Sequence, residues 1–118
     1  MGGRVNLAEK LGTFSEQWAP RIVARYNDNE VRIVKVEGEF IWHKHDETDE
    51  LFLVLEGRLD IELRDRVVSL GAGELFVVPR GTEHRPCARD GEAKLLLIDP
   101  VDTPNTGNRE TATQAVEA

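Results

Sequence analysis

A chain of 118 residues is long enough for one hydrophobic core and too short for two, so a single folded domain is expected. Its 22 acidic and 15 basic residues give a net charge of −7, which opposes binding to nucleic acid and to anionic membrane surfaces. Its longest apolar runs, LFLVL and LLLI, are far shorter than the roughly 20 residues of a membrane-spanning helix, so no membrane partner is expected.

The first residues and the cysteine content indicate a cytoplasmic protein. The start, MGGRVNLAEKLG, lacks the apolar stretch of a signal peptide, and Asn6 stands where a myristoylation motif has Ser or Thr. Cys87 is the single cysteine, so no internal disulfide can form and stability must come from packing.

Residues 1–20 are predicted to form a helical arm. Asn6 and Glu9 are spaced as in a capping box, and Gly12 interrupts the pattern, so one helix or two short ones are expected before Pro20. The apolar residues at helical spacing are Leu7, Leu11, Phe14 and Trp18.

From residue 21 the apolar period changes to two, and residues 21–101 are predicted to form an all-β domain. In the stretch RLDIELRD, Leu59, Ile61 and Leu63 share one face, so this strand should be half buried. Many short strands with turn residues about every ten positions favour a sandwich or barrel. The other predicted strands are RIVARY, EVRIVKVE, ELFVV and AKLLLI. Residues 102–118 have few large apolar side chains and are predicted to be a flexible tail that hugs the surface or is disordered.

All three histidines lie at the ends of predicted strands. His43 and His45 are two apart, so in an extended segment their imidazoles leave the same face. Glu50 begins the next apolar strand, and an antiparallel hairpin would bring it beside them. His84 follows the rigid PRGTE turn after another apolar strand.

Imidazole nitrogens with a carboxylate oxygen are the donors that a borderline divalent transition metal prefers. Burying several ionisable groups costs several kcal/mol each unless a cation neutralises them. One divalent ion of iron, manganese, zinc or nickel is therefore expected. Strand parity favours Glu50 as the carboxylate, because it shares a face with Phe52 and Val54. Its competitors, expected to be solvated loop charges, are Asp46, Glu47 and Asp49.

The spacing of these residues resembles the two motifs of the cupin superfamily. The first is matched by Gly38, His43, His45, Glu50 and Gly57, and the second by Gly73, Pro79, Gly81 and His84. The resemblance implies a small antiparallel double-stranded β-helix, or jelly-roll barrel, in which His43, His45, Glu50 and His84 are the metal ligands. Two features depart from the motifs: four residues instead of five follow Gly38, and Ala88 stands where the second motif ends in Asn.

The resemblance is to small single-domain cupins similar to the barrel core of phosphomannose isomerases. It implies a metal-dependent enzyme, of isomerase or oxygenase type, whose small oxygen-rich substrate (a carbonyl, carboxylate or polyol compound) is chelated to the ion. A non-catalytic binding or sensing protein is the alternative. An enzyme should show an acid or base beside the open coordination position, whereas a purely apolar pocket would favour binding. The sequence assigns no catalytic residue.

Four other residues have simpler interpretations. Trp42 should point away from the histidines and pack against another layer. Cys87 is expected to be a small buried hydrophobe. Arg80 and Arg85 are the only cations near the motifs and are expected to be solvated or paired with acids such as Glu83, so a sugar phosphate is a poor candidate substrate.

The strand after Glu50 is apolar on both faces, because Leu51, Leu53 and Leu55 alternate with Phe52 and Val54. A strand covered on both sides in so small a protein requires a second layer, from the N-terminal arm or from another chain. A homodimer is therefore expected.

Overall fold

The structure is a computed structural model that describes residues 3–108 and 111–118. The described residues form one short helix and eight strands. These are α1 (Leu7–Leu11), β1 (Arg21–Tyr26), β2 (Asn29–Glu39), β3 (Glu50–Glu56), β4 (Arg58–Leu63), β5 (Val67–Gly71), β6 (Leu75–Val78), β7 (His84–Pro100) and β8 (Val116–Glu117). The predicted all-β architecture is confirmed.

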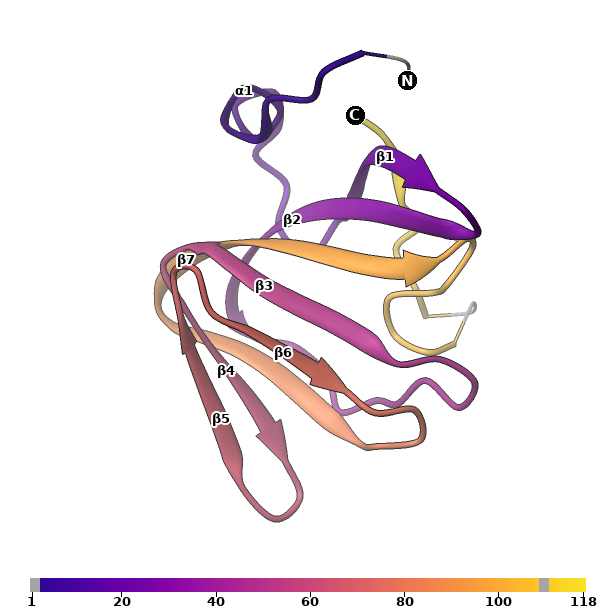
Figure 1. Cartoon of the computed structure of the whole chain (residues 1–118). Helices are drawn as coiled ribbons and strands as arrows, with labels where there is room; N and C mark the ends of the chain where they lie inside the picture. Colours follow the sequence, from indigo (N-terminus) through magenta and orange to yellow (C-terminus); the bar gives the residue numbers. More distant parts are fainter. Residues whose placement is uncertain (1–2, 109–110) are drawn as a thin grey trace.

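The two longest strands, β2 and β7, run antiparallel and hold the barrel together (Figure 1). The first half of β7 pairs with β4, and its second half pairs with β3. Between the halves the β2–β7 register shifts near Gly38, which has φ +78°. Because β7 bends at this irregularity, one strand serves both walls of the barrel. The sheet continues on one side to β5 and on the other to β1 and β8, while β6 pairs with β3.

The core fills the space between these walls. Leu59 and Ile61 are fully buried and Leu63 nearly so, as the alternation in β4 predicts. Burying each such side chain contributes about 1.5–3 kcal/mol. Across the lumen they are joined by Phe52, Val54 and other apolar residues of β2, β3 and β7. The barrel is therefore a packed body with little free space inside it.

The N-terminal arm is less helical than predicted. The Asn6 side chain caps α1 by accepting from the Glu9 amide (3.0 Å), and the helix ends at Gly12 as expected. No second helix follows, and Trp18 adopts a left-handed backbone with φ +57°. The helix packs on the outer face of the sheet, where Leu11 meets Val23 and Ile33.

The segment after β7 folds back along the sheet and ends in β8, which pairs in parallel with β1. Asn105 ties this segment to the arm by donating to the Trp18 carbonyl (3.3 Å) and accepting from the Thr113 amide (3.0 Å). In the part of the chain that the structure describes, no helix has the length and apolar character needed to cross a bilayer.

Gly57, in the turn between β3 and β4, should not tolerate a side chain. Its φ is +87°, and a Cβ atom would lie 2.9 Å from the Glu92 carbonyl oxygen and 3.0 Å from Ala93 Cα. Gly73 has φ +82° but open space around it. Gly73→Ala should therefore lower the free energy of unfolding only by the roughly 1–2 kcal/mol that an alanine costs in the left-handed backbone region. Gly57→Ala should lower the free energy of unfolding further. Chemical denaturation measures both variants, and equal losses would contradict the close approach.

Candidate metal centre

Four side chains from separate parts of the chain converge at one end of the barrel. Each offers a ligand atom, and these atoms all lie within 4.8 Å of one another: the residues are His43, His45, Glu50 and His84. Glu50 is the first residue of β3 and His84 the first of β7, while both other histidines lie in the segment between β2 and β3. The structure thus brings together the four residues that the sequence singled out.

The convergence is achieved differently from the sequence prediction. A hairpin between the histidine segment and β3 was expected, and this is wrong, because β3 pairs with β6 and β7. Instead His43 forms an isolated antiparallel bridge with His84, with amide-to-carbonyl distances of 3.0 and 2.9 Å. The backbones of these two histidines are therefore fixed to each other directly.

Backbone carbonyl groups orient two of the imidazole rings. His43 Nδ1 lies 2.9 Å from the Ile41 oxygen, and His84 Nδ1 lies 2.9 Å from the Thr82 oxygen. A carbonyl oxygen can only accept, so both Nδ1 atoms carry the proton. In the neutral rings each Nε2 then has a free lone pair, which is the arrangement that metal-ligating histidines show.

The contacts inside the cluster suit a cation. Glu50 Oε1 lies 3.2 Å from His84 Nε2 and 3.3 Å from His45 Nε2. Despite this short distance to Glu50, His45 Nε2 is buried and makes no hydrogen bond of acceptable geometry. Two donors that each bind one ion at about 2.1 Å and at right angles lie about 3 Å apart. A divalent ion would bind the unpartnered His45 Nε2 and would lie between the lone pairs of Glu50 Oε1 and the imidazole nitrogens. The residues present therefore fit a metal.

Titration of the site also favours a metal at neutral pH. Burial, together with the neighbouring His84, lowers the pKa of His43 to about 4, so this ring is neutral at pH 7. Burial would raise the pKa of Glu50, but contacts with His45 and His84 lower it to about 2. Burial also works against protonation of His45, yet Glu50 raises the pKa of that ring overall. A proton on His45 is therefore the competitor that a metal must displace.

The competing carboxylates stay outside the cluster. Asp49 accepts from the Arg80 amide at 2.9 Å, and its carboxylate pairs with the Arg80 side chain. Asp46 pairs with Lys44, and Glu47 is exposed. Arg80 is thus held on the surface by an acid, as expected, although its partner is not Glu83.

A small cavity of about 30 Å³ in the barrel lumen adjoins His43 and Glu50. Two aromatic rings help to line it: Trp18 and Phe40 stack with centroids 4.6 Å apart, and Phe40 meets the His43 ring edge-on. Asn105 contributes the one polar side chain besides the two candidate ligands. No sequence pattern indicated Trp18 or Asn105 as lining residues, because both reach the cavity from segments outside the barrel.

Comparison with known proteins agrees with this architecture. A model of the cupin domain family matches residues 30–99, well over half of the chain. The chain belongs to the cupin superfamily. YdbB of Bacillus subtilis (strain 168) is 38% identical to this cupin over 104 residues, which cover 80% of the chain and 92% of YdbB.

Two crystal structures resemble this cupin closely. The cupin-2 domain containing protein from Shewanella frigidimarina has a TM-score of 0.80 and 47% identity, covering 81% of this chain and 93% of that one. Protein NMB1881 from Neisseria meningitidis has a TM-score of 0.76 and 29% identity, with coverage of 83% and 99%.

The departure from the second cupin motif has a packing explanation. Ala88 pairs with Gly38 and is 1% exposed within the main core cluster. An apolar residue therefore fills the place of the motif's Asn, and its small side chain fits the crowded lumen where β2 and β7 change register.

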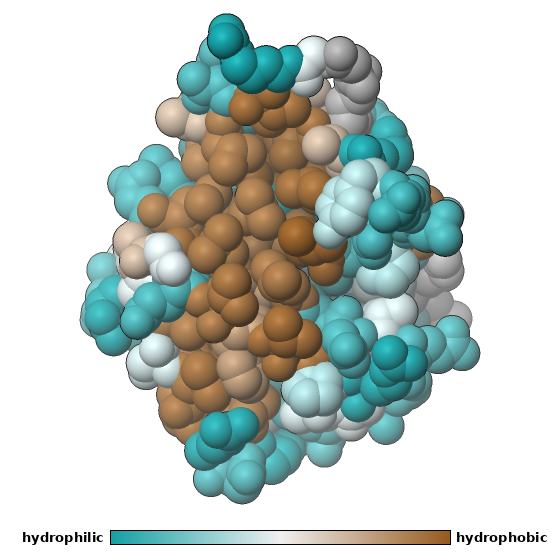
Figure 2. Space-filling view, viewed as in Figure 1, coloured by the Kyte–Doolittle hydropathy of each residue, from teal (hydrophilic) through white to brown (hydrophobic). Residues whose placement is uncertain are grey.

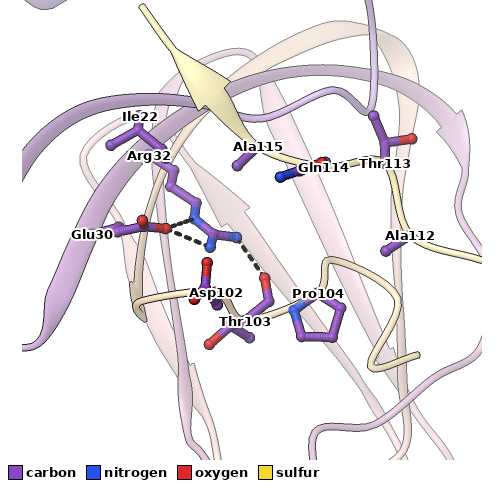
Figure 3. A pocket seen from close by; sticks show the side chains of 10 residues that line it. All are labelled: Ile22, Glu30, Arg32, Asp102, Thr103, Pro104, Ala112, Thr113, Gln114 and Ala115. Carbon is purple, nitrogen blue, oxygen red and sulfur yellow. Dashed lines mark hydrogen bonds and ion pairs between the residues drawn. The ribbon is translucent and has the colours of Figure 1, made fainter. Parts of the chain in front are cut away.

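A charged row that no sequence motif indicated lies at the same end of this cupin barrel. Glu30 and Asp99 are paired in register on β2 and β7, and both are buried. Arg32 donates to Glu30 from Nε (3.1 Å) and Nη2 (2.7 Å) and to the Thr103 carbonyl from Nη1 (2.9 Å) (Figure 3). Asp99 lies farther off, at 3.8 Å from the guanidinium, and its Oδ1 has no partner.

Trp42, Arg85 and Cys87 lie outside the candidate metal site. Trp42 does not line the lumen cavity; the guanidinium of Arg64 lies 3.8 Å from its ring centroid and that of Arg85 5.4 Å. Arg85 also pairs with Glu62 (2.7 Å), so its charge is neutralised on the surface. Cys87 is fully buried, and burial raises the pKa of its thiol.

Asp99 should make the metal-free protein less stable as the pH rises. Burial and the nearby Glu50 charge raise the pKa of Asp99 to about 8. The unfolded chain ionises this residue above about pH 4, while the folded protein keeps the proton until about pH 8. Between these pH values the free energy of unfolding of the natural protein falls by up to about 1.4 kcal/mol per pH unit.

Asp99→Asn removes this loss, so in chelator its stability advantage over the natural protein should grow between pH 5 and pH 8 by about 1–3 kcal/mol. Chemical denaturation at both pH values measures the difference. The exposed Asp90→Asn serves as the control and should show no such growth. An advantage of Asp99→Asn that is equal at both pH values would contradict the buried acid.

Proposed function

We propose that this cupin binds one divalent transition-metal ion through His43, His45, Glu50 and His84 and uses it to hold a small oxygen-rich molecule. The observation that carries this proposal is the convergence of four buried ligand atoms beside a cavity in the barrel lumen. Four protein ligands leave one or two coordination positions for a small molecule. The bound ion would act as a Lewis acid or, if it is iron, activate dioxygen.

The wall of the cavity favours chemistry supplied by the ion itself. Apart from the two candidate ligands, the described lining holds no acid or base, and Asn105 is its one other polar residue. Isomerisation requires a protein group that moves a proton between carbons, within hydrogen-bond reach of the substrate. For a chelated substrate bound in this cavity, oxygenase-type chemistry is therefore the better candidate of the two enzyme types.

A non-catalytic binding or sensing role is the second candidate, and the same apolar wall favours it. The two roles differ in what happens to a bound ligand. Iron-loaded protein that consumes oxygen and converts a chelating ligand in air would support the enzyme, whereas recovery of the ligand unchanged would support binding.

Metal content tests the proposed site directly. Protein purified without added metal should contain about one equivalent of a divalent transition metal by elemental analysis. His43→Ala removes a donor and Glu50→Gln replaces an anionic oxygen by a neutral amide oxygen, so the metal affinity of each variant should fall at least tenfold.

Glu47→Gln is the matched control for Glu50→Gln, because it makes the same change on a solvent-exposed carboxylate. This variant should keep its metal. Equally little metal in the natural protein and in His43→Ala, after incubation with excess zinc or iron, would show that the four residues do not form a metal site.

We also propose that two copies associate through the outer face of the sheet. Strand register places Val77, Leu51 and Ile98 in one row across β6, β3 and β7, and Leu75, Leu53 and Leu96 in the next. Figure 2 shows an apolar band over this face. Leu75 is 56% exposed and Val77 40%, and no other strand in the described residues covers the outer edge of β6. Exposed apolar bands of this kind mark protein interfaces.

Light scattering should give twice the chain mass for the natural protein. Val77→Lys places a charge on the edge strand β6 of this face and should shift the protein to monomers at micromolar concentration. Val67→Lys makes the same change at a 55% exposed site on β5, away from the face, and should remain dimeric. A natural protein that is monomeric at high micromolar concentration would refute the association.

A further inference from the structure

The charge around the metal centre restricts which molecules can reach it. Two openings adjoin the candidate ligands: the lumen cavity beside His43 and Glu50, and a wider cleft of about 440 Å³ beside His45. A ligand that coordinates the ion from either side meets the residues that line these openings, so their charge affects which ligands bind.

The lumen cavity offers no compensation for a second negative charge. Its described lining includes neither Lys nor Arg. Burying a carboxylate or phosphate there without a cation would cost several kcal/mol. The aromatic pair Trp18–Phe40, and the apolar side chains Phe52, Leu95 and Leu97 deeper in the lumen, instead favour a planar or aliphatic body.

Arg32, the cation on the inner face of β2, is already neutralised by Glu30. Arg32 lies two residues before Val34, which lines the lumen, but its guanidinium is held by Glu30 and Thr103 (Figure 3). It faces a different cavity of about 330 Å³, under the segment that leads to β8. None of the four candidate ligands lines that larger cavity, so its size does not make it the metal site.

The second opening repels anions as well. Beside His45 it is lined by Asp46, which pairs with Lys44 at 3.3 Å, and by Glu47 and Asp102, and its described lining also includes neither Lys nor Arg. Both approaches to the ion therefore disfavour a ligand with an anionic group beyond the one that coordinates.

Resting on the metal site proposed above, we infer that the natural ligand is a small molecule with two adjacent oxygen donors and an otherwise uncharged, apolar body. Phosphorylated sugars and dicarboxylates are disfavoured, because neither described lining supplies a Lys or Arg to pair with their extra charge. The cavity of about 30 Å³ holds roughly one water, so binding of an apolar body requires side chains that line the cavity to move. A movement of the Trp18 ring off Phe40 would break the hydrogen bond from its Nε1 to the Glu37 carbonyl (3.0 Å), whereas the bond from the Trp18 amide to the Lys35 carbonyl (2.8 Å) could remain.

Two test ligands with the same chelating group separate the charge effect from chelation. Catechol and 3,4-dihydroxybenzoate share a pair of adjacent hydroxyl groups and differ by one carboxylate. Calorimetry on zinc-loaded protein should find catechol bound at least tenfold more tightly, a difference of about 1.4 kcal/mol.

A designed cation should reduce this preference. Asn105→Arg places a guanidinium at the lumen cavity and should lower the preference for catechol at least threefold. Gln114→Arg adds the same charge at an exposed site outside both openings and should leave the preference unchanged.

Metal analysis of the same samples distinguishes the two proposals. If the protein holds stoichiometric zinc but binds the acid as tightly as catechol, or does not bind catechol, the ligand class is wrong and the metal site stands. If no zinc binds, the proposed function fails and the ligand class fails with it.

Discussion

The structure depends on an electrostatic constraint at one end of the barrel. Three imidazoles and the Glu50 carboxylate are buried so closely that Glu50 Oε1 lies 3.2–3.3 Å from two ring nitrogens. Backbone carbonyls hold the Nδ1 proton of His43 and His84, so their free lone pairs are on Nε2. Such an arrangement is stable only with a proton or a metal ion between the groups. The neutral His43 at pH 7 favours the metal ion.

The barrel positions this cluster with a single bent strand. β7 begins at His84, crosses to the other wall after the register change opposite Gly38, and ends with Asp99 and Pro100. Its two halves pair with β4 and β3, so the start of β7 and the start of β3 reach the same end of the lumen. The His43–His84 bridge adds the third chain segment. A metal would therefore join three segments that the barrel already holds in register.

The same end of the barrel carries a surplus of buried acid. Glu30, Glu50 and Asp99 are balanced by one well-paired cation, Arg32, and the orphaned Asp99 takes up a proton instead. A divalent ion would reduce this surplus but would not remove the acidic residues that line the cleft beside His45. Buried acids thus affect the stability of the metal-free protein, and a separate set of acids on the cleft underlies the proposed selectivity against anionic ligands.

The sequence by itself determined the all-β class, the half-buried face of Leu59, Ile61 and Leu63, and the four residues that meet in the candidate site. These rest on a period of two and on motif spacing, which are local properties of the chain. The hairpin expected between the histidines and β3 is absent, because strand pairing is decided by long-range contacts. Of the one or two helices expected in the arm the structure has one, α1, and the Trp18 ring stacks on Phe40.

Only the tertiary structure decided what surrounds the ligands. Trp18 and Asn105 come from the arm and the C-terminal segment, and Arg32 and Asp99 from the paired strands β2 and β7. The positions of Trp18 and Asn105 follow from how their segments pack on the barrel, and those of Arg32 and Asp99 from the pairing of β2 with β7. The four candidate ligands can therefore be predicted from sequence spacing. The apolar lining of the cavity, and the lack of Lys and Arg in its described part, can be seen only in the three-dimensional structure.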